Sequence, residues 1–139
     1  MSSIPDISAP RPTILIVDDE TDILRLVEKI LTEQGYDVIL SRGAQNAINA
    51  FSRMARKPDL ILTDVVMPGM SGPMLIDHLL AISQNLRVLF MSGYDERQVV
   101  QKYVVDKGFA LIPKPFTPQQ LAEAVKGALS KPLQGGTPA

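Results

Sequence analysis

Three carboxylates, one hydroxyl and one ammonium group stand at the ends of short apolar segments of this chain. Asp18 and Asp19 follow the run ILIV, Asp64 follows LILT, Ser92 closes RVLFMS, and Lys114 follows FALIP. Carboxylates this close repel one another and cost free energy to bury, so a positive partner is expected beside them. Carboxylate oxygens with no His or Cys nearby in sequence are hard ligands, which suit Mg²⁺ or a similar cation.

The same set of residues would also suit a phosphoryl group. A bound cation and Lys114 would offset its negative charge, while the Ser92 hydroxyl and the backbone N–H of Gly93 would orient its oxygens. The pattern therefore predicts phosphoryl chemistry, provided that the fold brings these residues together.

Apolar segments of strand type alternate along the chain with segments of helical periodicity. The expected strands are 13–17, 36–40, 60–63, 87–92 and 109–112, and the expected helices are 22–35, 44–55, 72–82, 96–107 and 117–130. This alternation indicates an α/β fold with a parallel sheet, and the continuously apolar strands indicate helices on both faces. We expect a doubly wound, five-stranded sheet in the flavodoxin-like order 2-1-3-4-5. The first and third strands are neighbours in that order, so Asp18, Asp19 and Asp64 should meet between their carboxyl ends.

Three of the helices carry specific expectations. The first should turn Ile23, Leu26, Val27, Ile30 and Leu31 inward; the last should bury Leu121, Ala124, Val125, Ala128 and Leu129 after an N-cap at Thr117. The fourth helix has more apolar positions than one buried stripe needs, namely Val99, Val100, Tyr103, Val104 and Val105. Some of these should be exposed, which predicts a partner or homodimer surface formed by helix 96–107, strand 109–112 and helix 117–130.

Composition excludes several other classes of protein. The chain has 139 residues and a net charge of -1, which gives no general attraction to nucleic acid. It has no cysteine and a single histidine, His78, expected on a helix surface, so zinc–thiolate and histidine-rich metal sites are excluded. No apolar run reaches membrane-spanning length and no signal peptide is present, so a cytoplasmic location is expected. We expect one domain over 12–130, between flexible tails at 1–11 and 131–139.

Four short motifs, in order and each at an expected strand end, resemble the receiver domain of bacterial two-component response regulators. They are VDDE at 17–20, LTDVVMPGMSG at 62–72, MSGY at 91–94 and KPF at 114–116. The second is similar to the family's phosphoacceptor segment, in which a Gly lies eight positions after the Asp, here Gly72 and Asp64. MSGY and PKPF also resemble the receivers of hybrid sensor kinases.

The resemblance implies a role for each residue of the reaction. Asp64 would take a phosphoryl group from a histidine kinase or a histidine phosphotransfer protein, giving an acyl phosphate. Ser92 and Lys114 would contact the phosphoryl oxygens, together with the backbone N–H groups of Val65 and Gly93. Lys114–Pro115 would be a cis peptide, which is a specific expectation because only about 5–6% of X–Pro bonds in folded proteins are cis.

The resemblance also implies the Mg²⁺ ligands and the residues that govern the switch. Asp19 and Asp64 would bind the ion directly, Asp18 mainly through water, and Val66 through its carbonyl oxygen. Val66 and Tyr94 would flank the water that hydrolyses the acyl phosphate. Leu111 stands three positions before the lysine, where many receivers have an aromatic residue, so rotation of an aromatic ring at this position would not carry the signal.

Two other classes of protein compete with this interpretation. A metal-dependent aspartyl phosphohydrolase would need a second carboxylate two residues after the nucleophile, where this chain has Val66. A pseudo-receiver that only binds partners should have lost an acidic residue, the acceptor or the lysine, and all are present. The sequence does not distinguish a stand-alone protein from a piece of a hybrid kinase, and it names neither kinase nor output.

Overall fold

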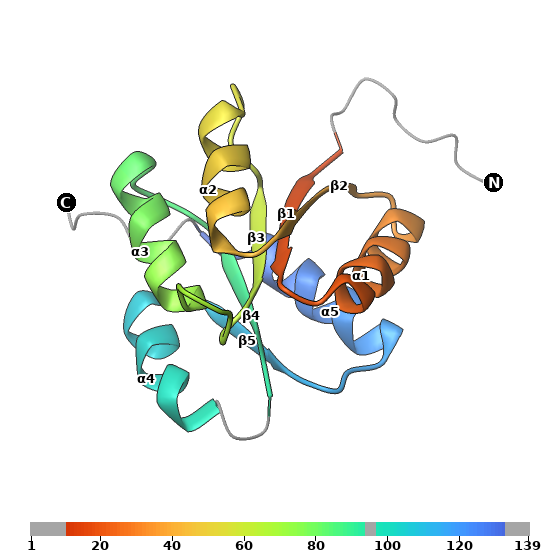
Figure 1. The fold of residues 1–139 in the computed structure, drawn as a ribbon. Coiled ribbons are helices and arrows are strands. Elements are labelled where there is room, and N and C mark those ends of the chain that lie inside the picture. Colours follow the sequence, from red (N-terminus) through yellow and green to blue (C-terminus); the bar gives the residue numbers. More distant parts are fainter. Residues whose placement is uncertain (1–10, 94–96, 133–139) are drawn as a thin grey trace.

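A computed structural model describes residues 11–93 and 97–132, apart from the side chains of residues 97–99. Five strands alternate with five helices, as the sequence predicts (Figure 1). The strands are β1 (Thr13–Asp18), β2 (Asp37–Arg42), β3 (Leu60–Asp64), β4 (Val88–Ser92) and β5 (Ala110–Pro113). The helices are α1 (Thr21–Glu33), α2 (Ala44–Arg53), α3 (Gly72–Ile82), α4 (Arg97–Lys107) and α5 (Pro118–Leu129).

The sheet is parallel, with the strand order β2-β1-β3-β4-β5, and this confirms the predicted order. β1 lies between β2 and β3, with Asp18 opposite Arg42 of β2 and Val17 opposite Thr63 of β3. The last residues of β1 and β3 therefore reach the same edge of the sheet. β5 is an edge strand, where Pro113 can be accommodated although it has no N–H to donate.

Each face of the sheet has its own apolar core. Alternate residues of a strand point to opposite faces, so Ile14 and Ile16 pack with α1 and α5. Leu15 and Val17 pack on the other side with residues of α2, α3 and α4. Figure 1 shows these two helical layers on either side of the sheet. Burial on both faces explains why the strand sequences are continuously apolar.

The inward face of α1 differs from the prediction at one position. Leu26, predicted to face inward, is 47% exposed, whereas Leu24, which was not among the predicted inward residues, is buried. Successive helical residues are about 100° apart around the axis. Val27 lies near the centre of the buried stripe, so Leu26 falls on its rim. Ile23 lies in the first turn, about 40° from Val27 around the axis, and is half-buried, while Ile30 and Leu31 are buried as predicted.

α5 begins as predicted, with Thr117 as N-cap and Pro118 as the first helical residue. The Thr117 hydroxyl accepts from the Gln120 amide and the Gln120 side chain accepts from the Thr117 amide, which completes a capping box. Leu121, Val125 and Ala128 are buried, while Ala124 and Leu129 pack from the margin.

α4 buries only part of its apolar surface, as expected. Val100 and Val104 are buried, Tyr103 is half-buried and Val105 is 69% exposed. The side chain of Val99, part of the same expectation, lies outside the described residues, as do most of the expected tails. The part of the chain that the structure describes contains no helix long and apolar enough to cross a bilayer.

Candidate functional site

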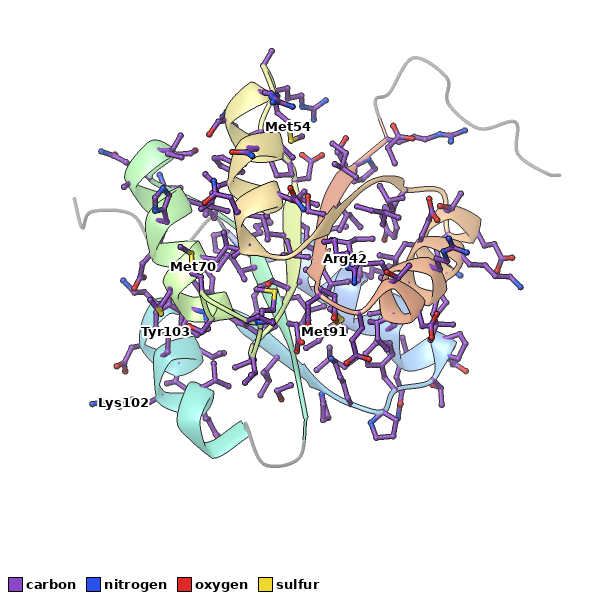
Figure 2. All side chains as sticks on the ribbon, in the orientation of Figure 1. Arg42, Met54, Met70, Met91, Lys102 and Tyr103 are labelled. Carbon is purple, nitrogen blue, oxygen red and sulfur yellow. The ribbon has the colours of Figure 1, made fainter. Side chains whose placement is uncertain are left out.

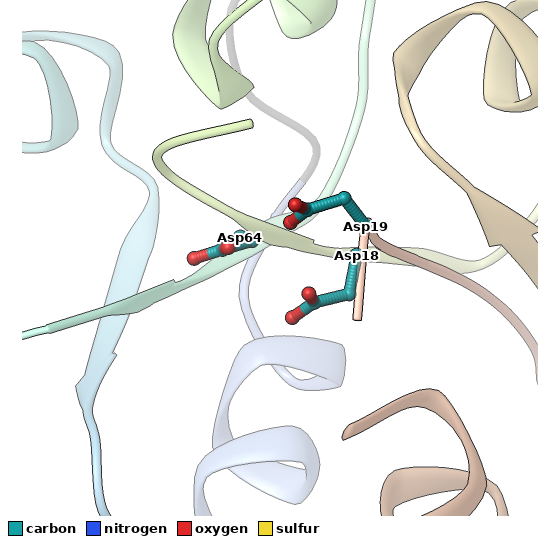
Figure 3. A group of neighbouring side chains, drawn as sticks. All are labelled: Asp18, Asp19 and Asp64. Atoms are coloured by element: carbon teal, nitrogen blue, oxygen red, sulfur yellow. The ribbon is translucent and has the colours of Figure 1, made fainter. Parts of the chain in front are cut away.

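The carboxylates predicted to meet do so at the carboxyl ends of β1 and β3 (Figure 3). Asp18 ends β1, Asp19 follows it, and Asp64 ends β3, which is hydrogen-bonded to β1. One carboxylate oxygen from each residue lies within 4.8 Å of the others. Asp18 is fully buried and Asp64 is 5% exposed, so their charges are largely removed from water.

Backbone amides orient two of these carboxylates. Oδ1 of Asp18 accepts from the Glu20 N–H at 2.9 Å, and Oδ1 of Asp64 accepts from the Val65 N–H at 2.9 Å. The Val65 N–H also donates to the Met91 carbonyl at 3.1 Å. The Val65 amide is therefore engaged by protein acceptors, whereas the family resemblance implies that it contacts a phosphoryl group.

Lys114 brings a cation into the cluster from the end of β5. Its Nζ lies 3.1 Å from Oδ1 of Asp64 and 3.5 Å from Oδ2 of Asp18. Burial alone would lower the pKa of Lys114, but attraction to Asp64 and Asp18 outweighs it and the pKa is raised. Burial raises the pKa of Asp18 above its usual range, although the Glu20 amide and Lys114 act against this. The Lys114–Pro115 peptide is cis, as predicted.

Ser92 closes the site from β4. Its side chain is fully buried, and its Oγ is the one buried side-chain polar atom without a hydrogen-bond partner among the described residues. Such an orphaned hydroxyl costs free energy unless a ligand or another state satisfies it. The Ser92 carbonyl accepts from the Lys114 N–H at 2.8 Å, which ties the ends of β4 and β5 together. Gly93 follows, half-buried.

The loop after β3 explains why a glycine stands eight residues after Asp64. The Gly72 N–H donates to the Val65 carbonyl at 2.7 Å, which folds the loop back on the acceptor strand. A Cβ on Gly72 would collide with the Asp64 carbonyl oxygen and lie 3.2 Å from both Phe90 and Val65. Only a residue without a side chain allows this approach. Val66 lies in the same loop with its side chain 55% exposed.

The remaining residues singled out from sequence lie as follows. Leu111 is half-buried opposite Phe90 in the β4–β5 pairing. His78, expected on a helix surface, is exposed. Tyr94, expected to flank the hydrolytic water, lies outside the described residues.

Sequence reasoning missed the corner between β2 and α2. The Gly43 N–H donates to the Asp18 carbonyl at 3.1 Å, and Nε of Arg42 donates to the Asp19 carbonyl at 3.2 Å. The predicted strand order held a signal for this contact, since the second strand borders the first and their ends lie together.

Known proteins resemble this chain in sequence. Residues 14–126 match the family described as the response regulator receiver domain. The sensor kinase CckA of Brucella abortus is 33% identical over 119 residues, which is 86% of this chain but 13% of CckA. Sporulation initiation phosphotransferase F of Bacillus subtilis is 30% identical over 113 residues, which is 81% of this chain and 90% of that protein.

Solved structures agree on the fold. A response regulator receiver domain protein from Clostridium thermocellum superposes with a TM-score of 0.78 at 24% identity, over 85% of this chain and 94% of that one. NtrX from Brucella abortus gives a TM-score of 0.78 at 29% identity, over 86% of this chain and 27% of NtrX. With the family match covering most of the chain, this protein belongs to the response regulator receiver domains, which are phosphoacceptor signalling domains.

Proposed function

We propose that Asp64 accepts a phosphoryl group from a phosphohistidine, with Mg²⁺ bound by the neighbouring carboxylates. Receiver domains interact with histidine kinases or histidine phosphotransfer proteins, and one of these would be the donor. The supporting observation is the meeting of Asp64, the acidic pair, Lys114 and the orphaned Ser92 hydroxyl at one edge of the sheet. The proposal includes a cytoplasmic location, where such a donor would meet the domain.

The donor set fits Mg²⁺. Three ionised carboxylates and one ammonium group carry a formal charge of -2, which a divalent cation neutralises. Ligands on opposite sides of one Mg²⁺ lie about 4.2 Å apart, since each Mg–O bond is about 2.1 Å. Carboxylate oxygens within 4.8 Å of one another need little adjustment, or one water between Asp18 and the ion. We assign Asp19 and Asp64 as direct ligands, with the Val66 carbonyl as a further one.

The chemical step needs a fixed nucleophile and a stabilised phosphoryl group. A carboxylate oxygen of Asp64 attacks phosphorus, an O–P bond forms, and the N–P bond of the donor breaks with its electron pair returning to the imidazole. The Val65 amide and Lys114 hold the Asp64 carboxylate in one orientation beforehand. Mg²⁺, when bound, offsets charge on the phosphoryl oxygens.

After transfer, the Ser92 hydroxyl donates to a phosphoryl oxygen, the Gly93 amide binds another, and Lys114 pairs with the same group. This would satisfy a hydroxyl that is fully buried without a partner in the described structure. Because Ser92 ends β4, its movement would shift β4 and the adjacent α4. Leu111, opposite Phe90 on β5, stands where many receivers have an aromatic residue, so rotation of an aromatic ring would not carry the signal here. The signal would instead pass through displacement of β4 and α4.

The face formed by α4, β5 and α5 is proposed as the output or homodimer surface. Val105 is 69% exposed on α4, and a groove of about 450 Å³ lies over β5 and α5. Its apolar lining includes Leu111, Ile112, Pro113 and Ala124. Displacement of β4 and α4 would alter this face directly.

The alternatives are less well supported. A phosphohydrolase would need an acid or base two residues after Asp64, and Val66 there has no ionisable group. Incubation with acetyl phosphate and Mg²⁺, followed by intact-mass analysis and a phosphate-release assay, separates the three classes. We expect one phosphoryl group per chain, lost slowly, and none with EDTA. Continuous phosphate release without a modified protein would indicate an enzyme, and absence of both would indicate a pseudo-receiver.

A further inference from the structure

The β2–α2 corner contacts both peptide carbonyls of the acidic pair. Arg42 ends β2 opposite Asp18, so the corner lies against the end of β1. The Gly43 N–H donates to the Asp18 carbonyl at 3.1 Å, and Nε of Arg42 donates to the Asp19 carbonyl at 3.2 Å. Nδ2 of Asn46, in the first turn of α2, donates to the Arg42 carbonyl at 2.6 Å and holds the corner in turn. Figure 2 labels Arg42.

The carboxylate of Asp19 depends on this corner more than the carboxylates of Asp18 and Asp64 do. The carboxylate of Asp18 is held by the Glu20 amide and Lys114, and that of Asp64 by the Val65 amide and Lys114. Within the described part of the chain, no donor holds the half-buried carboxylate of Asp19. Its direction is therefore set through its backbone, which the corner holds on both sides. The Gly43 N–H binds the carbonyl of the peptide that precedes Asp19, and the Arg42 guanidinium binds the carbonyl of Asp19 itself.

We propose that Arg42 is a positioning residue, which orients Asp19 towards the divalent cation by holding its peptide carbonyl. This inference rests on the proposed function, since it assumes a cation at the site. Arginine suits the task because its Nε–H lies in a rigid planar group, which a flexible lysine lacks.

The charge of Arg42 and its hydrogen bond to Asp19 predict opposite changes in Mg²⁺ affinity when Arg42 is replaced. A guanidinium beside an anionic cluster repels an incoming cation, so removing the charge should tighten Mg²⁺ binding. Removing the hydrogen bond lets the Asp19 backbone vary, which should weaken Mg²⁺ binding. The sign of the change therefore distinguishes the two roles, and Arg42→Lys removes the Nε–H while keeping the charge.

The test measures Mg²⁺ affinity by calorimetry, without any phosphodonor, for wild type, Arg42→Lys and Arg42→Ala. A net hydrogen bond corresponds to roughly 2- to 10-fold in an equilibrium constant, so Arg42→Lys should weaken binding by about that factor. Arg42→Ala should weaken binding less, because loss of the positive charge partly offsets loss of the hydrogen bond. Arg25→Ala, which removes an exposed arginine on α1, is the matched control and should leave the affinity unchanged. In an Asp19→Asn background, Arg42→Lys should have no further effect, because the ligand it positions is gone.

Each outcome has a defined meaning. Unchanged or tighter Mg²⁺ binding in both Arg42 variants, with normal binding by wild type, would overturn this inference and leave the proposed function intact. Weakening that persists in the Asp19→Asn background would also overturn it. Absence of Mg²⁺ binding by wild type would overturn the proposed function and the inference together. Should Arg42→Ala fail to fold, the milder Arg42→Lys carries the test, with its metal-free melting temperature as the check on folding.

Discussion

The ammonium nitrogen of Lys114 lies 3.1 Å from Oδ1 of Asp64, although 50 residues separate them in the chain. The contact joins the ends of two strands that are not neighbours, β3 and β5, across the end of β4. Lys114 thus acts as an internal counter-ion for carboxylates that would otherwise be buried with uncompensated charge.

Lys114→Met should therefore destabilise the metal-free protein and increase its response to Mg²⁺. Loss of the cation removes the ion pairs that Lys114 makes with Asp18 and Asp64, and we expect the free energy of unfolding to fall by about 1–3 kcal/mol. Mg²⁺ should stabilise the variant more than wild type, because no ammonium group competes with it. Urea unfolding with Mg²⁺ and with EDTA measures both effects, with Lys102→Met on the exposed side of α4 as control. An equal gain from Mg²⁺ in both proteins would contradict this role.

Gly72→Ala should destabilise the loop that carries the acceptor. The new Cβ would press on the Asp64 carbonyl and on the neighbouring Val65 and Phe90, which typically costs about 1–3 kcal/mol. Gly127→Ala, at an exposed position of α5, is the matched control. The new Cβ would meet nothing within 4 Å, and the substitution should stabilise the protein by up to about 1 kcal/mol. Chemical denaturation compares the two. Equal effects would show that the approach at Gly72 is not tight.

Tyr103 should make stability depend on alkaline pH. Its hydroxyl donates to Oδ1 of Asp77 on α3 at 2.7 Å, and burial, followed by this carboxylate, raises the pKa of Tyr103. The folded state therefore favours the protonated form. This contribution is complete below the unfolded pKa of about 10 and is lost as pH rises towards the higher folded value.

Tyr103→Phe removes that dependence. Near neutral pH the variant should be less stable by about 1 kcal/mol, the net value of a hydrogen bond. Between about pH 9 and pH 11 wild type should lose about 1.4 kcal/mol more than the variant. Denaturant unfolding at several pH values gives the difference, with Tyr36→Phe as control. A difference between wild type and Tyr103→Phe that does not vary with pH would refute the assignment.

Val66 should help to set the lifetime of the phosphorylated state. Its side chain is 55% exposed beside the acceptor and offers no hydrogen bond to an attacking water. Val66→Asn should speed dephosphorylation by on the order of tenfold, or about 1.4 kcal/mol of barrier. Decay of the phosphorylated protein in Mg²⁺ gives the rate, with Tyr94→Glu in parallel. Unchanged decay in both variants would show that these two side chains do not set the lifetime of the phosphorylated state.

Much of the fold follows from local patterns in the sequence. The continuously apolar strands indicated helices on both faces, and the site then followed from where those strands end. Thr117 and Pro118 marked the start of α5 correctly because capping depends on adjacent residues. The acidic cluster could be predicted because β1 and β3 were expected to be adjacent strands, which brings their last residues together.

Contacts between side chains of different helices and strands could not be predicted from these local patterns. Leu24 and Leu26 are both leucines on α1, and which one is buried depends on the rotation of the helix against the sheet. The Tyr103–Asp77 contact joins two helices whose spacing is set by packing of the whole core. The strand order places Arg42 near the end of β1, but it does not show that the side chain reaches the Asp19 carbonyl. Periodicity does not fix these distances.

The central claim is that Asp64 is the phosphoacceptor, and locating the acyl phosphate tests it most directly. The protein is treated with acetyl phosphate and Mg²⁺, reduced with borohydride to convert the acyl phosphate to homoserine, and mapped by peptide mass spectrometry. We predict homoserine at position 64, none in Asp64→Asn, and normal labelling in Asp22→Asn, which removes an exposed carboxylate from the nearby first turn of α1. Labelling at Asp18 or Asp19 in the wild type, or persistent labelling in Asp64→Asn, would contradict the account.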